Sequence, residues 1–537
     1  MKSYFLALIC LLSFGNKVNG QDNLYCTDNP YRSWWNVVHY TLKTTIPAQT
    51  ESINGTVTIR AVAREHTIDT IQIDLQSPLQ LSMVKVNGIY RTALKNGNAY
   101  LIPTGYIMKE DTFSVELQYQ GIPVQAKKAP WDGGFVRHKD ENGKPWLGVA
   151  CQGIGASVWF PCKDYPGDEP ELGADLYYTT DAEYTAIGNG ALIGADNVGT
   201  KEKEWHWRVT KPINLYDITF YIGDYMQIRD TLQGSNGLLP LDYYILRSNV
   251  AKAHKQFTVV KPMLRAFEYW MGPYPFYADG YKLVDAPYLG MEHQSAIAYG
   301  NDYKMGYAGT DRSQTGVGTL FDFIIVHESG HEWFGNQVSI NDVAYSWIHE
   351  GFTTYSETLF AESLFGQDKA FQYQRGCWRL IRNDRPMEGI PGECDGGSGD
   401  HYVKGSAMIH MIRMLMKDDQ RFRQLLLDIG RTYGYKTISG PELERFMIKK
   451  TKLKLKPLFA QYLRTTQVPE LVLVRNAKGF TYQWQSCLGG YNIPVLVYID
   501  GKPQWLKPTT KAKQFKSATA KVVKASPDFY INCKGLE

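Results

Sequence analysis

The spacing of apolar residues divides the chain into three regions of different character. From about residue 35 to 235, apolar and polar residues alternate in short runs separated by Gly, Asn and Pro, a pattern typical of β-strands. Around residue 250 the period lengthens to that of helices, and residues 469–537 return to short strand-like runs. The clearest strands are expected at 37–46, 55–63, 67–75, 112–120 and 217–229, and helices at 251–272, 317–336, 348–365, 405–417 and 419–434.

These regions predict a multidomain α+β protein. A chain of 537 residues also has the length of roughly three domains. We place an N-terminal β-domain at 21–235, a mainly helical domain at 236–468 and a small C-terminal β-sandwich at 469–537. The composition, with 44% hydrophobic and 21% charged residues, is that of a globular protein.

Residues 1–20 have the features of a secretory signal peptide. Lys2 precedes an apolar run of about a dozen residues, and a small-residue end predicts cleavage after Gly20. The run is short for a bilayer span, and no other segment is apolar enough for one. We therefore expect export to the periplasm or secretion.

The net charge excludes some classes of function, and the cysteine content bears on disulfide formation. The formal net charge of +4 argues against nucleic-acid binding and against a polybasic membrane surface. Seven of the eight cysteines follow the predicted cleavage site, and an oxidising compartment permits disulfides. Cys377–Cys394 and Cys487–Cys533 are candidate pairs, although the sequence leaves the connectivity open and the odd count leaves at least one free thiol.

The chemistry of the chain is concentrated in the segment HESGHEWFGNQVSINDVAYSWIHE. On a helix, His327 and His331 are four positions apart and share one face. Glu350 follows after 18 residues, inside a second amphipathic run, and can supply the third ligand of a catalytic zinc site. Glu328 is expected to point toward the metal-bound water and act as general base. Glu332 is expected to serve only packing and solvation.

The same segment resembles the zinc signature of the aminopeptidase N family, which includes leukotriene hydrolase. YLGMEHQSAIAYG resembles the Gly-x-Met-Glu-Asn motif of that family, HYVKG resembles its Tyr-x-Lys-Gly motif, and CQGIGASVWFPCKD resembles a Gln-bearing strand of its N-terminal domain. The match runs from about residue 35 to 475. It implies a saddle-like N-terminal β-sheet domain, a thermolysin-like catalytic domain, one zinc ion per chain and hydrolysis of N-terminal residues from peptides.

The resemblance also implies the roles of individual residues. Tyr402 would stabilise the oxyanion that develops during hydrolysis. Glu292 would bind the α-ammonium of the substrate, with Gln152 completing this pocket and with Gly290 and Met291 in the same substrate-binding loop.

Two further positions match the family near the metal, and three depart from it. Glu357 and Asn336 are the matches, and we expect them to support the metal ligands. Leu289 stands where the family often has Gly, His293 where it usually has Asn, and Ser157 where relatives often have Arg. These departures are expected to alter the wall of the pocket.

Several alternatives compete with a zinc aminopeptidase acting on peptides that have a free N-terminus. A non-catalytic peptide-binding protein on the same scaffold would be expected to lose Glu328 or Tyr402. An epoxide hydrolase of the leukotriene hydrolase type carries a C-terminal helical domain, for which residues 469–537 leave no room. A thermolysin-like endopeptidase would have no reason to retain Glu292 in its motif. Without the helical domain, the cleft is expected to be more open, or covered by a partner or a second copy of the chain.

Overall fold

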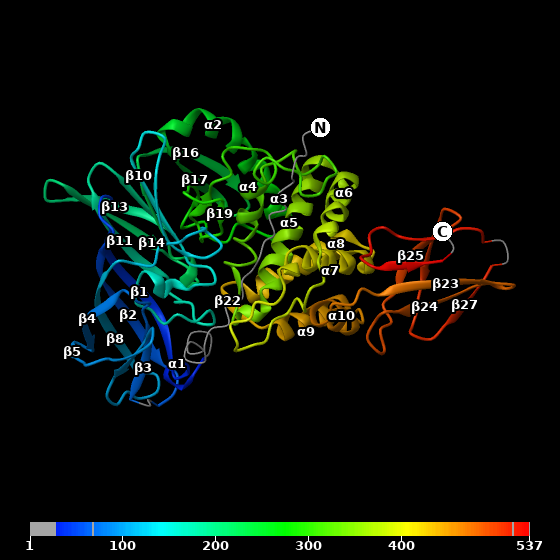
Figure 1. Cartoon of the computed structure of the whole chain (residues 1–537), viewed down its shortest axis with the longest axis horizontal. Coiled ribbons are helices and arrows are strands. Elements are labelled where there is room, and N and C mark those ends of the chain that lie inside the picture. The colour runs from blue at the N-terminus through cyan, green and yellow to red at the C-terminus, as the bar shows by residue number, and fades with distance from the viewer. Residues whose placement is uncertain (1–27, 67–68, 518–519, 536–537) are drawn as a thin grey trace, which may run out of the picture.

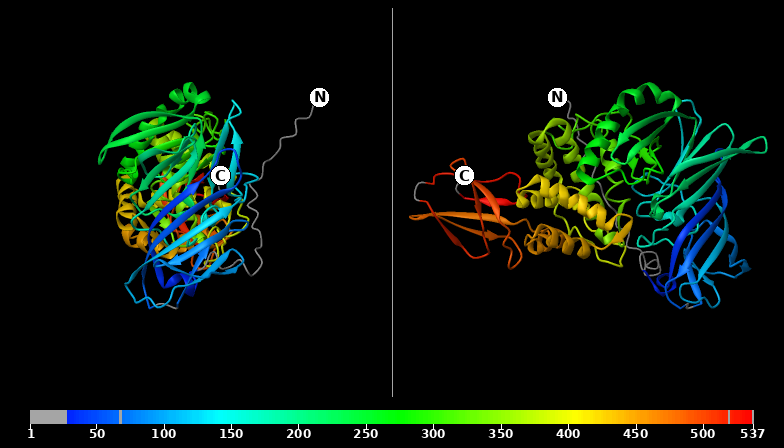
Figure 2. Two further views of the ribbon diagram at one scale, coloured as in Figure 1. Left: turned by 90° about the vertical axis from the view of Figure 1, so that its left-hand side faces the viewer. Right: turned by 180° about the vertical axis from the view of Figure 1, so that it is seen from behind.

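The computed structural model describes residues 28–66, 69–517 and 520–535, and its three units follow one another in an elongated molecule (Figures 1 and 2). A β-rich N-terminal unit lies at one end, helices fill the middle, and a small β-unit lies at the other end. The expected multidomain α+β fold is confirmed. The predicted signal peptide lies outside the described residues.

The N-terminal unit is built on a large twisted sheet. Alternate residues of its central strands β1 and β2, such as Tyr40 and Ile59, are fully buried on one face. The order across the sheet is β13 (Ala191–Val198), β14 (Glu202–Val209), β11 (Ala174–Asp181), β1 (Trp35–Thr45), β2 (Ile53–Ala63), β8 (Thr112–Gly121), β4 (Gln80–Val86) and β5 (Ile89–Tyr90). Only the pairing of β1 with β11 is parallel among the described pairs of this sheet.

Two smaller sheets and a short helix complete this unit. The first sheet has the order β12 (Thr185–Gly188), β15 (Phe220–Gly223), β10 (Pro145–Ala150) and β9 (Gly134–Lys139). The second has the order β3 (Thr70–Asp74), β7 (Ala99–Pro103) and β6 (Leu94–Asn96), and the helix is α1 (Pro30–Ser33). Strand β10 leads directly into the segment that carries Gln152, so this sheet brings an N-terminal residue to the cleft.

The middle unit begins with a five-stranded sheet. Its order is β16 (Tyr225–Gly234), β17 (Gly237–Leu246), β18 (Tyr281–Asp285), β20 (Ile297–Tyr299) and β19 (Gly290–Met291). The predicted boundary at 235/236 falls between β16 and β17, which pair along their whole length. The two-residue strand β19 is the edge of this sheet, and it consists of Gly290 and Met291.

Helices make up the rest of the middle unit. They are α2 (Val250–Gln256), α3 (Val260–Met271), α4 (Phe323–Gly330), α5 (Trp347–Phe365), α6 (Gln367–Cys377), α7 (Val403–Met416), α8 (Asp419–Tyr433), α9 (Gly440–Thr451) and α10 (Lys456–Arg464). A two-stranded sheet of β21 (Val338–Ile340) and β22 (Lys436–Ile438) lies among them. Among the described residues, no helix is long and apolar enough to cross a membrane.

One expected helix is much shorter than its apolar pattern suggested. The prediction of a helix over 317–336 is wrong at both ends, since α4 covers only Phe323–Gly330. The helix begins late because the Asp322 carboxylate accepts hydrogen bonds from the backbone N–H groups of Ile324 and Ile325 and so caps it. After His331 the chain turns back, and Gly335 adopts a positive φ of 142° that favours glycine. The segment 317–336 is apolar because much of it is buried, and not because it forms one continuous helix.

The C-terminal unit consists of two sheets that share one apolar core. One has the order β27 (Lys513–Lys516), β24 (Gly479–Gln485), β23 (Glu470–Asn476) and β29 (Asn532–Lys534), and the other β26 (Lys502–Leu506), β25 (Val495–Ile499) and β28 (Val523–Ala525). Phe480, Trp484 and Val497 are buried between them. This is the predicted small β-sandwich.

Both candidate disulfides are wrong. Cys394 is disulfide-bonded, whereas Cys377 is a buried free thiol on α6. Cys487 is also a free thiol, which excludes its pairing with Cys533. Proximity along the chain was a poor guide because a disulfide requires two Cα atoms within about 7 Å and suitably directed side chains, which neighbouring positions in a sequence do not ensure.

Candidate active site

Three buried side chains from two helices converge in the middle unit. His327 lies in the last turn of α4, His331 caps its C-terminus, and Glu350 lies in the first turn of α5. The Oε2 atom of Glu350 is 3.4 Å from His331 Nε2 and 3.7 Å from His327 Nε2. The three residues are 5% exposed or less. The two halves of the sequence motif therefore meet, with two imidazole nitrogens and one carboxylate oxygen facing a common point.

The outer nitrogen of each imidazole is held by the protein. His327 Nδ1 lies 2.7 Å from Glu357 Oε1, and Glu357 also accepts a hydrogen bond from the Tyr373 hydroxyl. His331 Nδ1 lies 3.0 Å from the carbonyl oxygen of Phe334. An acceptor at Nδ1 fixes the ring orientation and presents the Nε2 lone pair for ligation, as in carboxylate–histidine–metal arrangements. Glu357 thus lies where the sequence placed it, two turns beyond Glu350 on α5.

The donor set fits a zinc ion. The Oε2 atom of Glu350 is buried and has no hydrogen-bond partner within the described part of the chain. A buried carboxylate oxygen without a donor is costly unless a cation compensates it. Two imidazoles and one carboxylate with a further position for water are the usual ligands of catalytic zinc. The ligand atoms of His327, His331 and Glu350 all lie within 4.8 Å of one another, as a shared ion requires.

Glu328 lies against the edge strand β19, and this contact explains a glycine of the second motif. A Cβ atom added to Gly290 would lie 2.7 Å from Glu328 Oε1, so the carboxylate would have to move away. Gly290 therefore allows the carboxylate to approach the strand closely. Burial raises the pKa of the Glu328 carboxyl to about 7. A carboxyl group with such a pKa can both accept and donate a proton near neutral pH.

Tyr402 reaches the cleft because two helices cross at glycines. Gly405 of α7 packs on Gly351 of α5, and a Cβ atom at Gly405 would lie 3.0 Å from the Gly351 Cα. This close approach brings the start of α7, where Tyr402 caps the helix, beside the ligand helix. The Tyr402 ring lies 5.9 Å from that of His327 between centroids. Its hydroxyl can therefore act on groups bound at the metal.

A second carboxylate borders the cleft on the side of the N-terminal unit. Gln152 Nε2 donates to Glu292 Oε1 at 2.7 Å, and the Tyr216 hydroxyl donates to the same oxygen at 3.0 Å. Asn336 Nδ2 donates to the backbone carbonyl of Glu292 at 2.9 Å. Met291 lines the cleft beside Glu292. Two donors on one oxygen leave Glu292 Oε2 as the acceptor for a ligand.

The structure corrects four expectations about neighbouring residues. His293 does not shape the pocket wall, because it is fully buried and its Nδ1 lies 2.7 Å from the Tyr221 hydroxyl. Asn336 supports the Glu292 loop rather than a metal ligand. Glu332 is not solvated, since it is fully buried and accepts hydrogen bonds from Ser295 N and the Tyr274 hydroxyl. Ser157 is also buried and bonds Asp164, away from the cleft.

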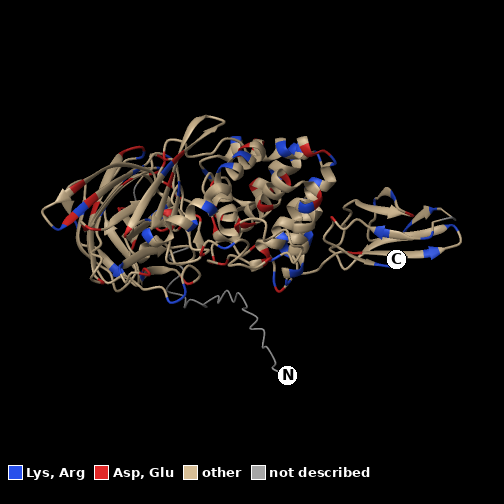
Figure 3. Ribbon diagram, turned by 90° about the horizontal axis from the view of Figure 1, so that it is seen from above, with Lys and Arg blue, Asp and Glu red and all other residues tan. Residues whose placement is uncertain are grey.

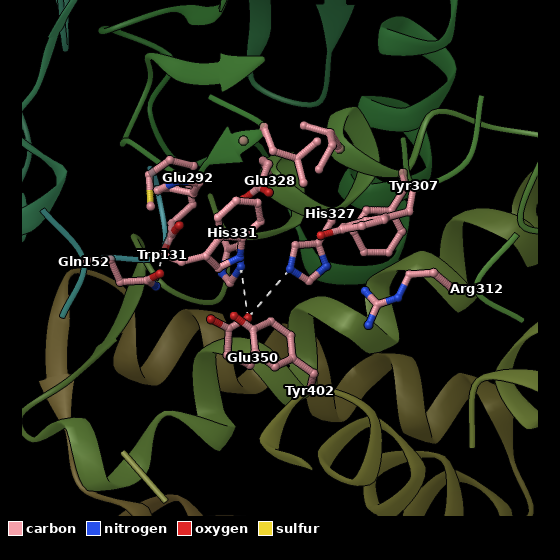
Figure 4. Close-up of a pocket in the computed structure, with 16 residues that line it drawn as sticks. Trp131, Gln152, Glu292, Tyr307, Arg312, His327, Glu328, His331, Glu350 and Tyr402 are labelled. Atoms are coloured by element: carbon pink, nitrogen blue, oxygen red, sulfur yellow. Dashed lines mark hydrogen bonds and ion pairs between the residues drawn. The ribbon is translucent and has the colours of Figure 1, made fainter. Parts of the chain in front are cut away.

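The cleft also contains residues that no motif indicated. It encloses about 880 Å³, including space open to solvent, and Leu289 lies on its wall as expected. Figure 4 shows Trp131 near Gln152 and Glu292, whereas Tyr307 and Arg312 lie beyond His327. Tyr216 was missed as well. The only sequence signal for Trp131, Tyr307 and Arg312 is an aromatic or basic residue in a glycine-rich loop, and such residues are common elsewhere in this chain. Tyr216 lacks even this signal, because it lies in a short 3-10 helix, Leu215–Asp217.

Comparisons with known proteins agree with this geometry. The family model described as "Peptidase family M1 domain" matches residues 256–462, and "Peptidase M1 N-terminal domain" matches residues 36–216. Human aminopeptidase N is 24% identical over 65% of this chain and 37% of its own length. Aminopeptidase N of Lactobacillus helveticus is 24% identical over 71% of this chain and 45% of its own length. The chain thus spans less than half the length of these curated relatives.

A solved structure extends the comparison to the fold. A substituted M1 zinc metallopeptidase from Deinococcus radiodurans, bound to a Tyr-Ser-Ala substrate, has a TM-score of 0.69 and 20% sequence identity. The match covers 82% of this chain and 96% of that one. Together the findings define a zinc metallopeptidase fold with its metal-binding residues in place. The chain belongs to peptidase family M1, the aminopeptidase N family.

Proposed function

We propose that this protein is a zinc-dependent aminopeptidase that hydrolyses the N-terminal residue from peptides. The observation that carries this proposal is the Gln152–Glu292 pair beside the ligand set, with a separation of 2.7 Å. Glu292 and Glu328 lie so close to His331 that a carboxylate oxygen of each is within 4.8 Å of a ring nitrogen. A substrate ammonium on Glu292 would place the first peptide bond, and no later one, at the metal.

The residues divide the reaction between them. His327, His331 and Glu350 would hold the zinc ion, which supplies an activated water and polarises the scissile carbonyl when bound. Glu328 accepts a proton at its carboxylate and returns it to the departing amine. Tyr402 donates a hydrogen bond to the oxygen that gains negative charge. Glu357 keeps the ring of His327 in the orientation needed for ligation.

The Glu292 end of the cleft sets the exopeptidase character. An α-ammonium group has a pKa near 8 and is mostly charged at neutral pH, so it pairs with a buried carboxylate. Gln152 and Tyr216 contact Glu292 from the N-terminal unit. An internal segment of a peptide has no charged amine to pair with this carboxylate. This argues against an endopeptidase.

The other candidate functions have less support. A non-catalytic binding protein would not need Glu328 and Tyr402, yet both line the cleft together with the three ligands. An epoxide hydrolase has less support because the relatives reported above are named aminopeptidase N. Cover of the cleft by a second copy of the chain stays a prediction.

The proposal is tested by pairing one peptide with and without an N-terminal acetyl group. We expect hydrolysis of the free peptide, inhibition by a chelator and restoration by zinc. The acetylated peptide should be cleaved about 100-fold less, because it leaves the buried Glu292 charge unpaired. Cleavage of the capped peptide at internal bonds and at a comparable rate would place the protein among endopeptidases.

We also propose that the protein is exported, either to the periplasm or out of the cell. The support is the signal-like sequence of residues 1–20 and the disulfide-bonded Cys394, since disulfides persist in oxidising compartments. Figure 3 shows acidic and basic residues interspersed over the N-terminal and middle units, whereas Lys and Arg predominate on the C-terminal unit. Fractionation of cells that produce the full chain, with sequencing of the mature N-terminus, tests export. An unprocessed cytoplasmic protein would contradict it.

A further inference from the structure

The cleft has a positively charged residue at the end opposite Glu292. Arg312 lines the cleft together with Tyr307, Phe323 and the metal ligands. In Figure 4 its guanidinium points toward His327 and Tyr402 from one side, whereas Glu292 and Gln152 lie on the other side of the ligand set. The cleft therefore has a negative group at one end, the metal ligands in the middle and a positive group at the far end.

Aromatic rings hold the Arg312 guanidinium in place. Its Cζ atom lies 5.1 Å from the ring centroid of Tyr307 and 5.1 Å from that of Phe323. These are cation–π distances, which stabilise the position of a guanidinium and leave its charge available. Phe323 in turn stacks on His327 with 5.1 Å between the ring centroids. The guanidinium is thus positioned relative to a metal ligand through one intervening ring.

Within the described part of the chain, no acidic side chain neutralises Arg312. Across residues 28–66, 69–517 and 520–535, its guanidinium makes no hydrogen bond and no ion pair. The adjacent Asp311 does not serve as partner, because its carboxylate accepts hydrogen bonds from Ser313 N at 2.8 Å and from Gly316 N at 2.6 Å. The backbone carbonyl of Arg312 is held by the Arg379 guanidinium. The loop thus fixes the backbone of Arg312 and leaves its half-buried side chain facing the cleft.

Distance along a bound peptide indicates what Arg312 would meet. With the substrate ammonium at Glu292 and the first peptide bond at the metal, the chain continues past His327 toward Tyr307 and Phe323. An extended peptide advances about 3.5 Å per residue, and the two 5.1 Å spacings that join the His327 ring to Arg312 Cζ through Phe323 set an upper limit of about three residues between them. A planar guanidinium is suited to bind a carboxylate with two parallel hydrogen bonds.

We propose that Arg312 forms a carboxylate-binding subsite on the leaving side of the cleft, which recognises the free C-terminus of di- and tripeptides. This inference rests on the proposed aminopeptidase activity and specifies its substrate class. Arg312 is then a specificity-determining residue that makes the enzyme favour short peptides held at both charged ends. The same chemistry could be supplied by an acidic side chain at the second substrate position, and the test separates the two sources.

The experiment compares matched substrates on the holoenzyme. Leu-Gly-Gly and its C-terminal amide differ only in the terminal carboxylate, and Leu-Asp-amide and Leu-Asn-amide differ only in a side-chain carboxylate. Each is assayed with the wild-type enzyme and with Arg312→Met, Arg312→Lys and Arg312→Glu. Arg265→Met, at an exposed arginine of α3, controls for the loss of one positive charge. Zinc content and hydrolysis of leucine p-nitroanilide are measured for every variant.

We expect the wild type to favour the free acid over the amide by about 10- to 100-fold in kcat/KM, the range for contacts to charged groups. Arg312→Met should bring this ratio near one, Arg312→Lys should keep part of it, and Arg312→Glu should favour the amide. Arg265→Met should leave the ratio as in the wild type.

Three results would overturn the inference. One is a wild-type ratio near one, and another is a ratio that Arg312→Met does not change. The third is an equal loss on all substrates together with zinc, which would mean that Arg312 only packs Tyr307 and Phe323. An Arg312-dependent preference for Leu-Asp-amide alone would assign the subsite to acidic side chains instead of peptide termini. If the wild type does not hydrolyse leucine p-nitroanilide at all, the aminopeptidase proposal itself fails.

Discussion

The two ends of the cleft are built differently. Glu292 is only 3% exposed, and two donors from the N-terminal unit, Gln152 and Tyr216, fix one of its oxygens. Arg312 is half-buried and is positioned by the faces of two rings. A buried charge with fixed donors imposes a strict requirement on the ligand, because leaving it unpaired is costly. A partly exposed charge such as that of Arg312 is solvated by water when no ligand binds it. It therefore changes the preference among peptide substrates without being required for their binding.

Loss of a metal ligand should have the largest effect, because neither Glu292 nor Arg312 can support hydrolysis without zinc. We expect His331→Ala to lose zinc and activity together, because two remaining ligands cannot form the tetrahedral site. Metal content after dialysis and turnover of an aminoacyl reporter measure this effect. Retention of stoichiometric zinc by His331→Ala would show that the ligand assignment is wrong.

Removing the base should separate binding from chemistry. Glu328→Gln preserves shape and should keep zinc but lower kcat by about 100- to 10,000-fold. Because this variant turns over slowly, calorimetry can measure how tightly it binds intact peptides. The same peptide is compared with a blocked N-terminus, a blocked C-terminus and both termini blocked. Blocking the N-terminus should weaken binding more than blocking the C-terminus. The reverse order would invalidate the comparison between Glu292 and Arg312.

Tyr402→Phe gives a smaller effect of a different kind. It should lower kcat far more than it changes KM, because its hydrogen bond forms chiefly in the transition state. Kinetics with the free-acid and amide peptides should show the same proportional loss at both, since Tyr402 acts between the two ends. Loss of zinc in parallel with activity would instead indicate a structural role.

At the Glu292 end, Tyr216→Phe tests whether the second donor on Oε1 matters. We expect a loss of about 0.5–1.5 kcal/mol in the binding of free peptides, the typical contribution of one hydrogen bond. The loss should appear in KM and vanish for the acetylated peptide, which does not use Glu292. Tyr243→Phe, at a tyrosine of β17 that does not line the cleft, is the matched control. An equal effect of both variants would mean that Tyr216 does not position Glu292.

Raising the salt concentration should have the smallest effect, and it should change the preference at only one end of the cleft. Raising the salt concentration from about 0.1 to about 1 M shortens the Debye length from about 10 to about 3 Å. The preference for a free C-terminus at the half-exposed Arg312 should decline, while the preference for a free N-terminus at the buried Glu292 should change little. Equal salt sensitivity of the two preferences would show that the ends do not differ in burial when substrate is bound.

The sequence by itself determined the parts of the protein that depend on local spacing. The alternation over 37–46 and 55–63 predicted β1 and β2, because successive side chains of a strand face opposite sides. The spacing of His327, His331 and Glu350 predicted their convergence, since two helices need only pack once to join them. The motifs around Glu292 and Tyr402 led to residues that the fold brings into one cleft.

Only the tertiary structure decided which residues without a motif share that cleft. Arg312 and Trp131 line the cleft from loops of two units, and Tyr216 reaches Glu292 from a short 3-10 helix of the N-terminal unit. Their contacts depend on how the N-terminal sheets dock on the helices. The same packing buried His293 away from the substrate and shortened the helix expected over 317–336 to α4. Local patterns cannot encode such contacts, because side chains distant in sequence meet only after the apolar faces of sheets and helices are buried against each other.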